Sequence, residues 1–486
     1  MADREQAGDG AELWRLALQA PPVRAQALLV ALPAGASPPS CLGQRATELQ
    51  ALAQGLPDVA EAQRVLAHHA TRLLKHDQSP VDAIAWSPDG RHLASMGSRT
   101  IQLWDGGSGA CLRQLAPAAG RFNTMAWSPD GRLLAAEVEA ISSTHGVANR
   151  IWIWETDGGR CLQILSDVGQ PRTMRWLGDG QHLAYGGVRR SNTIQVWSAT
   201  ANGCTPILTG HPWHDNHLAW SLDDRHLASA ARDGTIALWD LASGARSHTL
   251  PGQAKPICAL AWSPDGRQLA CADMNQSLRL WDPGTGACTR ALQGHGARVT
   301  DLAWTPDGRA LATASTDRTI RLWDGASGAR LQILAGHQDS VHEIAFSADG
   351  RCLASASADR TIRLWDAGKG VGTHLLTRQS PALASIAWSP DGRTLAVIGG
   401  DRGVQLWRRD LHELATLFET PLASWDRHHW DLVAACQRTW PPQDTVVLPW
   451  LRFITALGGV IRRFDVAMAE ASGDPNASSF AVLLDG

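Results

Sequence analysis

The chain has 486 residues, of which 44% are apolar and 19% are charged, and its net charge is −3 at neutral pH. This apolar content is sufficient for a buried core and excludes a largely disordered protein. The small net charge provides no general attraction for nucleic acid or for an anionic membrane surface.

Residues 1–70 are predicted to form a helical N-terminal segment. Helical patterns cover Val23–Leu32, Ala46–Gln54 and Val59–Leu74, and prolines interrupt them. Two interpretations are open for this segment, namely a small bundle packed on the rest of the protein and a docking element for a partner. Residues 1–10 are polar and acidic and do not resemble a secretion signal, so a cytoplasmic location is expected.

Two aromatic markers recur through the centre of the chain, as in repeat proteins. The first marker is a tryptophan whose last five intervals are 42 residues each, at Trp104, Trp154, Trp197, Trp239, Trp281, Trp323, Trp365 and Trp407. The second marker lies in phase with it, at Trp86, Trp127, Trp176, Trp220, Trp262, Trp304, Phe346 and Trp388. Eight copies of one structural unit are therefore predicted.

The unit at residues 335–376 shows the internal pattern of a repeat. Apolar and polar residues alternate over Ser340–Ser347, and small residues fill Cys352–Ser357 after a turn. Two more strands are predicted at Thr361–Trp365 and Thr373–Leu376. Four short antiparallel strands per unit are typical of a propeller blade, and blades must stack around an axis to bury both faces.

These repeats resemble the WD-repeat family. The family's Trp-Asp dipeptide is matched at residues 104–105, 239–240, 281–282, 323–324 and 365–366, and its Gly-His element at 210–211, 294–295 and 336–337. The resemblance implies an all-β fold, an eight-bladed WD-repeat β-propeller of four-stranded antiparallel blades over residues 71–418. Seven blades with one stray unit is the alternative.

The resemblance also implies a hydrogen-bonded network of His, Ser or Thr, Asp and Trp within a blade. Two repeats are complete, with His295, Ser315, Asp317 and Trp323 in one and His337, Ser357, Asp359 and Trp365 in the next. Repeat four has Ala231 at the Ser position, and the first three repeats depart further. Blades 6 and 7 are therefore expected to be the most regular, and the His and Asp residues are expected to be framework rather than catalytic groups.

Ring closure has two candidate strands. Thr71–Leu74 resembles the fourth strand of a blade, and Leu414–Phe418 fills the same position after repeat eight. We expect the N-terminal strand to close the ring, because it ties the chain ends together and removes an exposed edge.

Two parts lie outside the regular pattern. Repeat two has an insertion near Val138–Asn149, expected in the loop between its second and third strands. Residues 419–486 are predicted to be a mainly helical C-terminal extension, with helices over Ser424–Thr439 and from Trp450, and a last strand at Phe480–Leu484.

No cofactor or metal site is predicted. Asp426, His428, His429, Asp431 and Cys436 are suitable ligands by type, but their spacing fits no known metal motif. Several cysteines occupy the same position in different repeats, so they are expected to lie apart as reduced thiols.

In WD-repeat proteins the top face of the propeller is an exposed binding surface. The positions that correspond to it here are Arg121, Asn123, Arg172, Trp213, His214, Asn216, Arg232, Met274, Arg298, Thr300, Ser340 and His342. The set is rich in Arg, which favours a protein partner with an acidic segment. A second ring of Arg residues follows the first hairpin of most repeats, but neighbouring Asp residues offset it, so nucleic acid is not favoured.

The resulting hypothesis is a non-enzymatic scaffold that organises a multiprotein complex through the top face and the terminal extensions. A sensor or regulatory subunit of a bacterial signalling or anti-phage defence assembly is the main alternative, and a small-molecule ligand stays open. The bacterial source is inferred from the use of Arg in place of Lys, which occurs only at Lys75, Lys255 and Lys369. An enzyme with a site in the terminal regions is disfavoured, because no P-loop, nucleophile elbow or zinc motif is present.

Overall fold

The computed structural model divides the chain into two compact units. It describes residues 14, 16–32, 44–76, 80–116, 120–142, 146–166, 168, 173–186, 193–199, 203–209, 215–231, 233–241, 243–251, 255–377, 385–399, 403–425 and 427–472. One unit runs from Leu73 to Trp407, and the other combines Met1–Arg72 with Arg408–Gly486.

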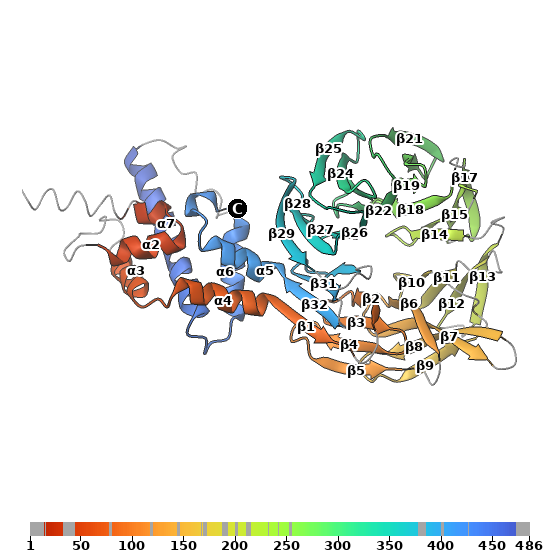
Figure 1. The fold of residues 1–486 in the computed structure, drawn as a ribbon, viewed down its shortest axis with the longest axis horizontal. Coiled ribbons are helices and arrows are strands. Elements are labelled where there is room, and N and C mark those ends of the chain that lie inside the picture. The colour runs from red at the N-terminus through yellow and green to blue at the C-terminus, as the bar shows by residue number, and fades with distance from the viewer. Residues whose placement is uncertain are drawn as a thin grey trace, which may run out of the picture. The chain divides into compact units, whose positions relative to one another are not determined.

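The Leu73–Trp407 unit consists of eight four-stranded antiparallel sheets arranged as the blades of a propeller (Figure 1). Blade 1 contains β2 (Val81–Trp86), β3 (His92–Gly97), β4 (Ile101–Asp105) and β5 (Cys111–Leu115). Blade 2 contains β6 (Arg121–Trp127), β7 (Leu133–Ser142), β8 (Gly146–Glu155) and β9 (Cys161–Leu165). Blade 3 contains β10 (Thr173–Trp176), β11 (His182–Gly186), β12 (Thr193–Ser198) and β13 (Gly203–Thr209). Blade 4 contains β14 (Asp215–Trp220), β15 (His226–Ala231), β16 (Ile236–Asp240) and β17 (Ala245–Leu250).

The remaining blades follow the same order. Blade 5 contains β18 (Ile257–Trp262), β19 (Leu269–Asp273), β20 (Leu278–Asp282) and β21 (Ala287–Leu292). Blade 6 contains β22 (Val299–Trp304), β23 (Ala310–Ser315), β24 (Thr319–Asp324) and β25 (Arg330–Ala335). Blade 7 contains β26 (Val341–Phe346), β27 (Cys352–Ser357), β28 (Thr361–Asp366) and β29 (Val371–Thr377). Blade 8 contains β30 (Ile386–Trp388), β31 (Thr394–Gly399), β32 (Gly403–Arg408) and β1 (Thr71–Lys75).

The core of the propeller lies between neighbouring blades. Leu322 of blade 6 and Ile344 and Trp365 of blade 7 belong to one buried cluster. The second strand of blade 7, β27, is buried along its whole length, as its small residues predict. Small side chains on this strand let adjacent sheets approach closely, which explains the Ala- and Ser-rich composition of the repeat.

The N-terminal strand closes the ring, as predicted. β1 pairs with β32, and the sheet order of blade 8 is β1-β32-β31-β30, so the orange and blue strands lie side by side in Figure 1. The expected alternative strand at Leu414–Phe418 is wrong, because this stretch belongs to helix α5 (Arg409–Leu417), which starts directly after β32. Seven blades with a stray unit is also wrong, since all eight sheets are complete.

The insertion in repeat two lengthens strands rather than a loop. β7 and β8 have 10 residues each and pair along their full length, from Leu133 with Glu155 to Ser142 with Gly146. The inserted residues satisfy their backbone hydrogen bonds by extending this hairpin beyond the other strands of blade 2.

The helical unit is made from both ends of the chain. Its N-terminal helices are α2 (Pro22–Val30), α3 (Gln44–Gln54) and α4 (Val59–Ala70), and its C-terminal helices are α5, the 3₁₀ turn η1 (Leu422–Ser424), α6 (Arg427–Thr439) and α7 (Val447–Ser472). Residues from both ends form one buried cluster. The Trp450 indole Nε1 donates a hydrogen bond to the Pro57 carbonyl at 3.0 Å. The two extensions predicted as separate segments therefore share one core, and the predicted strand at Phe480–Leu484 lies outside the described residues.

Helix α7 starts at Val447, three residues before Trp450, where the sequence pattern predicted its start. The carboxylate Oδ1 of Asp444 accepts hydrogen bonds from the backbone N–H groups of Val446 and Val447 at 2.9 and 2.6 Å. Pro449 lies in the first turn, where a helical N–H has no partner within the helix, so proline is tolerated there.

Candidate protein-binding face

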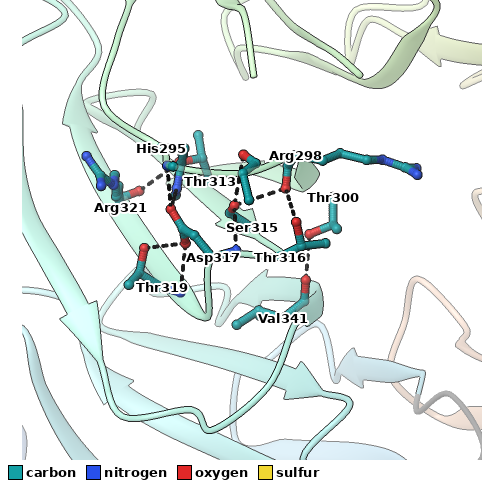
Figure 2. Close-up of polar contacts among 12 residues, drawn as sticks. His295, Arg298, Thr300, Thr313, Ser315, Thr316, Asp317, Thr319, Arg321 and Val341 are labelled. Carbon is teal, nitrogen blue, oxygen red and sulfur yellow. Dashed lines mark hydrogen bonds and ion pairs between the residues drawn. The ribbon is translucent and has the colours of Figure 1, made fainter. Parts of the chain in front are cut away.

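A buried hydrogen-bonded network holds the loops at one end of blade 6 (Figure 2). The Nδ1 atom of His295 lies 2.7 Å from the Oδ2 atom of Asp317, and its Nε2 atom lies 2.7 Å from the Thr313 hydroxyl. The Trp323 indole donates to the same hydroxyl at 2.9 Å. The Asp317 carboxylate favours a proton on Nδ1, which leaves Nε2 to accept from Thr313. The chain of contacts fixes the loop before β22 and the turn before β24 against each other.

Blade 7 repeats this network. His337 contacts Asp359 Oδ2 at 2.9 Å and the Ser355 hydroxyl at 2.7 Å. The Trp365 indole donates to Ser355 at 2.9 Å. Because each buried polar group has a partner, the network stabilises the blade.

Burial and hydrogen bonding shift the pKa values of the ionisable groups in the two networks. Burial alone would raise the pKa of Asp317, but hydrogen bonds from His295 and Thr319 outweigh it and keep the pKa well below 3.8. Asp359 follows the same rule. Burial lowers the pKa of His337 below 6.5 despite the neighbouring Asp359, which favours the neutral imidazole at neutral pH.

The hydroxyl of each network was predicted two residues C-terminal to its actual position. Thr313 and Ser355 take the positions assigned to Ser315 and Ser357, and residues two apart on a strand share a face. Ser315 instead donates to the Arg298 carbonyl at 2.9 Å and accepts from the Asp317 N–H at 3.0 Å.

Ser357 holds the corresponding turn of blade 7, where it donates to the Asp339 carbonyl at 3.0 Å. The same shift corrects repeat four, where Ser229, rather than the missing serine at Ala231, receives the indole bond of Trp239 at 2.9 Å.

A second set of indole bonds joins neighbouring blades. The second-marker tryptophans donate to an alanine carbonyl of the preceding blade at 2.9–3.2 Å in six places: Trp86 to Ala387, Trp127 to Ala85, Trp176 to Ala126, Trp262 to Ala219, Trp304 to Ala261 and Trp388 to Ala345. The Trp86 bond crosses the closure between blades 1 and 8. The Phe346 side chain of blade 7 has no N–H group and cannot donate this bond.

Two carboxyl groups on the inner strands of blades 6 and 7 form a half-buried pair. Asp301 Oδ2 accepts from the Ile344 N–H of blade 7 at 2.8 Å, and Glu343 Oε2 accepts from the Ile386 N–H of blade 8 at 3.3 Å. Burial raises the pKa of Asp301 to about 6, and burial together with the Asp301 charge raises the pKa of Glu343 to about 8. The pair connects three blades at a position that the sequence pattern did not single out, although both residues lie three positions before a second-marker aromatic.

The structure brings some of the predicted top-face residues to exposed positions. Arg298 is exposed on the loop before β22, and Met274 is 47% exposed after β19. Arg121 lies 4.0 Å from the Asp82 carboxylate, and the Asn123 amide donates to Glu139 at 3.4 Å.

Other predicted positions are framework or are not described. Thr300 donates to the Val341 carbonyl of blade 7 at 2.6 Å, so it connects blades. Ser340 and His342 are half-buried at the start of β26. Four of the predicted positions lie outside the described residues, namely Arg172, Trp213, His214 and Arg232. Asn216 lies on β14, but the structure does not describe its side chain.

A sequence model described as "WD domain, G-beta repeat" matches residues 68–105, 202–240, 244–282, 286–324, 328–366 and 372–408. Six units of this chain are WD40 repeats. Each WD40 match covers the outer strand of one blade and the first three strands of the next. The stretch between residues 105 and 202 includes blade 2 with its lengthened hairpin, in the part where the sequence predicted irregular repeats.

The WD40 chain is also similar to parts of two curated proteins. It is 29% identical over 154 residues to "Cell division cycle 20.1, cofactor of APC complex" of Arabidopsis thaliana, covering 30% of this chain and 32% of the relative. It is 28% identical over 173 residues to "Anaphase-promoting complex subunit cdc20" of Dictyostelium discoideum, covering 35% and 34% respectively. The chain thus spans about a third of the length of these relatives.

A solved structure has a similar fold. The crystal structure of the computationally designed Ika8 protein matches with a TM-score of 0.57 and 22% identity, over 69% of this chain and 98% of that chain. At this identity the likeness concerns the fold alone.

The opposite face of the WD40 propeller differs from the top face in how its charges are arranged. The arginines of the first hairpins are exposed but lie beside the aspartate of the same turn. The distances are 3.7 Å for Arg91–Asp89, 3.9 Å for Arg267–Asp265 and 3.6 Å for Arg309–Asp307. The positive charge on this face is therefore largely offset.

The metal-like cluster of the helical unit is an ion-pair cluster. His428 and His429 lie 3.2 and 3.9 Å from the Glu413 carboxylate. Asp431 pairs with Arg427, Cys436 is buried, and Asp426 lies outside the described residues. Within the described ranges, no group of three His, Cys, Asp or Glu side chains is placed to hold a metal ion, and no helix is long and apolar enough to cross a membrane.

Proposed function

We propose that this WD40 propeller is a non-enzymatic protein–protein interaction scaffold that organises a multiprotein complex through its top face and its terminal helices. The observation that supports it most is the exposure of Arg298 and Met274 on the top face. Arg and Met are enriched at protein interfaces. WD40 propellers generally bind protein partners and are generally not enzymes.

Side chains that would suggest catalysis have structural partners instead. His295 contacts Asp317 through one ring nitrogen and the Thr313 hydroxyl through the other, and this arrangement recurs in blade 7. The hydroxyl also receives an indole hydrogen bond, which suits a framework and not a nucleophile. The top-face loops are therefore held in place before a partner arrives, which lowers the entropic cost of binding.

A regulatory subunit of such an assembly is the second candidate. The names of the two partial relatives describe a cofactor and a subunit of a complex. This supports a regulatory role without identifying a complex for this chain. The proposed cytoplasmic location and bacterial source remain predictions from the sequence.

Affinity capture from the native host, followed by mass spectrometry, tests the scaffold. The full chain should retain specific proteins, and the Met274→Ala/Arg298→Ala variant should lose a part of them. The Arg267→Ala/Arg309→Ala variant of the opposite face is the matched control and should retain the wild-type set. An identical set for all three chains, or no specific protein with the wild type, would contradict the proposal.

A further inference from the structure

Three exposed arginines project from the top loops of blades 6 and 7. Arg298 precedes β22, Arg318 lies in the turn between β23 and β24, and Arg360 lies in the matching turn between β27 and β28. In Figure 2 the Arg298 side chain extends away from the Asp317 network. Arg318 and Arg360 were not among the residues predicted for this face.

Two of these arginines occupy strained backbone positions. Arg318 has a φ of 72° and Arg360 a φ of 66°, in the left-handed region that disfavours residues with a Cβ atom. The corresponding residue is Gly234 in blade 4, with a φ of 87°, and Gln276 in blade 5, with a φ of 69°. Glycine would form the turn without strain and glutamine also occupies it, so the turn itself does not require an arginine.

The positive charge of these arginines is not offset by the carboxylates around them. Asp317 and Asp359 are engaged by histidine, threonine and backbone donors in the two networks. In the described part of the chain, no ion pair joins Arg298, Arg318 or Arg360 to a carboxylate.

Two further contacts complete the local electrostatics. Arg298 also interacts with the Cys258 thiol, a group whose pKa is raised by burial and which therefore stays neutral. Asp339 is an exposed carboxylate in the loop before β26 of blade 7, and its Oδ1 atom accepts a hydrogen bond from the Ser340 N–H at 2.7 Å. On the opposite face, by contrast, four arginines lie within 4.0 Å of an aspartate carboxylate, namely Arg91, Arg132, Arg267 and Arg309.

We propose that Arg298, Arg318 and Arg360 form a docking site for an acidic segment of a partner polypeptide. Guanidinium groups bind carboxylates through paired, charge-assisted hydrogen bonds, so Asp and Glu side chains fit this surface. The loops that present these arginines are fixed by the His–Asp networks, so the charges keep their spacing when the segment is absent. The inference rests on the proposed scaffold function and adds the chemistry of the partner.

Fluorescence anisotropy with the full chain tests this site. The probe is a fluorescein-labelled peptide of alternating acidic and small residues, and the control peptide has Gln and Asn in place of Glu and Asp. The wild type should bind the acidic probe and lose affinity as salt rises, because exposed charges are screened. The Arg318→Gly/Arg360→Gly variant should bind about tenfold more weakly. Its Tm should equal or exceed the wild-type value, because glycine relieves the strain.

The matched control is Arg309→Ala/Arg351→Ala on the opposite face, which should keep wild-type affinity. Equal binding by Arg318→Gly/Arg360→Gly, no binding of the acidic probe by the wild type, or binding only to a phosphoserine version of the peptide would overturn the inference. A lower Tm for the glycine variant would also overturn it, by showing that the arginines stabilise the fold. If the probe fails while host proteins are still captured through the top face, the scaffold stands and only the acidic site is wrong.

Discussion

Replacing Glu343 with glutamine should remove a pH-dependent weakness of the propeller. Glutamine retains an oxygen that can accept the hydrogen bond from the Ile386 N–H and has no charge beside Asp301. The pKa of Glu343 is about 8 in the folded chain, against an ordinary value of 4.5. Between these values the folded chain holds a proton that the unfolded chain has lost, so stability falls as pH rises.

The magnitude follows from the size of this interval. Each pKa unit corresponds to about 1.4 kcal/mol, so Glu343 lowers the free energy of unfolding at pH 7 by up to about 3 kcal/mol relative to pH 4.5. Asp301, whose pKa is raised to about 6, acts in the same direction at lower pH. The Glu343→Gln chain should therefore be more stable than the wild type at pH 8, and the difference should shrink towards pH 5.

Urea unfolding at several pH values between 5 and 8, followed by tryptophan fluorescence, measures this difference. Asp339→Asn is a suitable control, because this carboxylate is exposed at the edge of the same blade. Parallel pH profiles for the wild type and Glu343→Gln, or a less stable variant at pH 8, would refute the argument that ionisation of this carboxyl pair destabilises the fold.

Three further substitutions test other parts of the fold. Phe346→Trp should add the missing inter-blade bond to the Ala303 carbonyl and raise the free energy of unfolding by about 0.5–1.5 kcal/mol, and unchanged stability in urea would contradict this. Asp317→Asn/Asp359→Asn should lower the free energy of unfolding at pH 7, because carboxylates with depressed pKa values stabilise the fold while they are ionised. The variant should also lose less stability than the wild type below pH 4, where these carboxylates become protonated, and acid titration followed by circular dichroism measures this loss. Trp450→Phe removes the hydrogen bond that joins the two chain ends, and hydrogen exchange should show faster opening of the helical unit, by about 1 kcal/mol, with no change in blades 5–7.

The sequence predicted the propeller well because its signals are local and repeated. Aromatic markers at a constant interval, turn residues and alternating strands occur within a single unit, so the fold follows once one unit is understood. The N-terminal closure was predictable from the similarity of Thr71–Leu74 to a fourth strand and from the cost of an open edge. The lengthened hairpin of blade 2 was not, because inserted residues between two strands extend the ladder only if their backbone groups find partners across it.

The site was harder to predict because it depends on contacts between distant residues. The family resemblance placed the network hydroxyls at Ser315 and Ser357. The residues two positions earlier, Thr313 and Ser355, lie on the same face of their strands and contact the histidines instead. The half-buried pair of Asp301 and Glu343 appears only when two blades are assembled, since each carboxylate binds a backbone N–H of the next blade. The common core of the two chain ends is likewise a tertiary fact, which the separate helical patterns could not show.

The offset between sequence repeat and structural blade has a consequence for how such a ring can change in evolution. Each repeat starts on the outer strand of one blade and ends on the third strand of the next, and β1 supplies the outer strand that the last blade lacks. If recombination removes or duplicates one whole repeat, β1 and β32 are both retained and can still pair to close the ring. The number of blades is set by the number of copies of the unit, and the closure serves any of these rings without a new sequence.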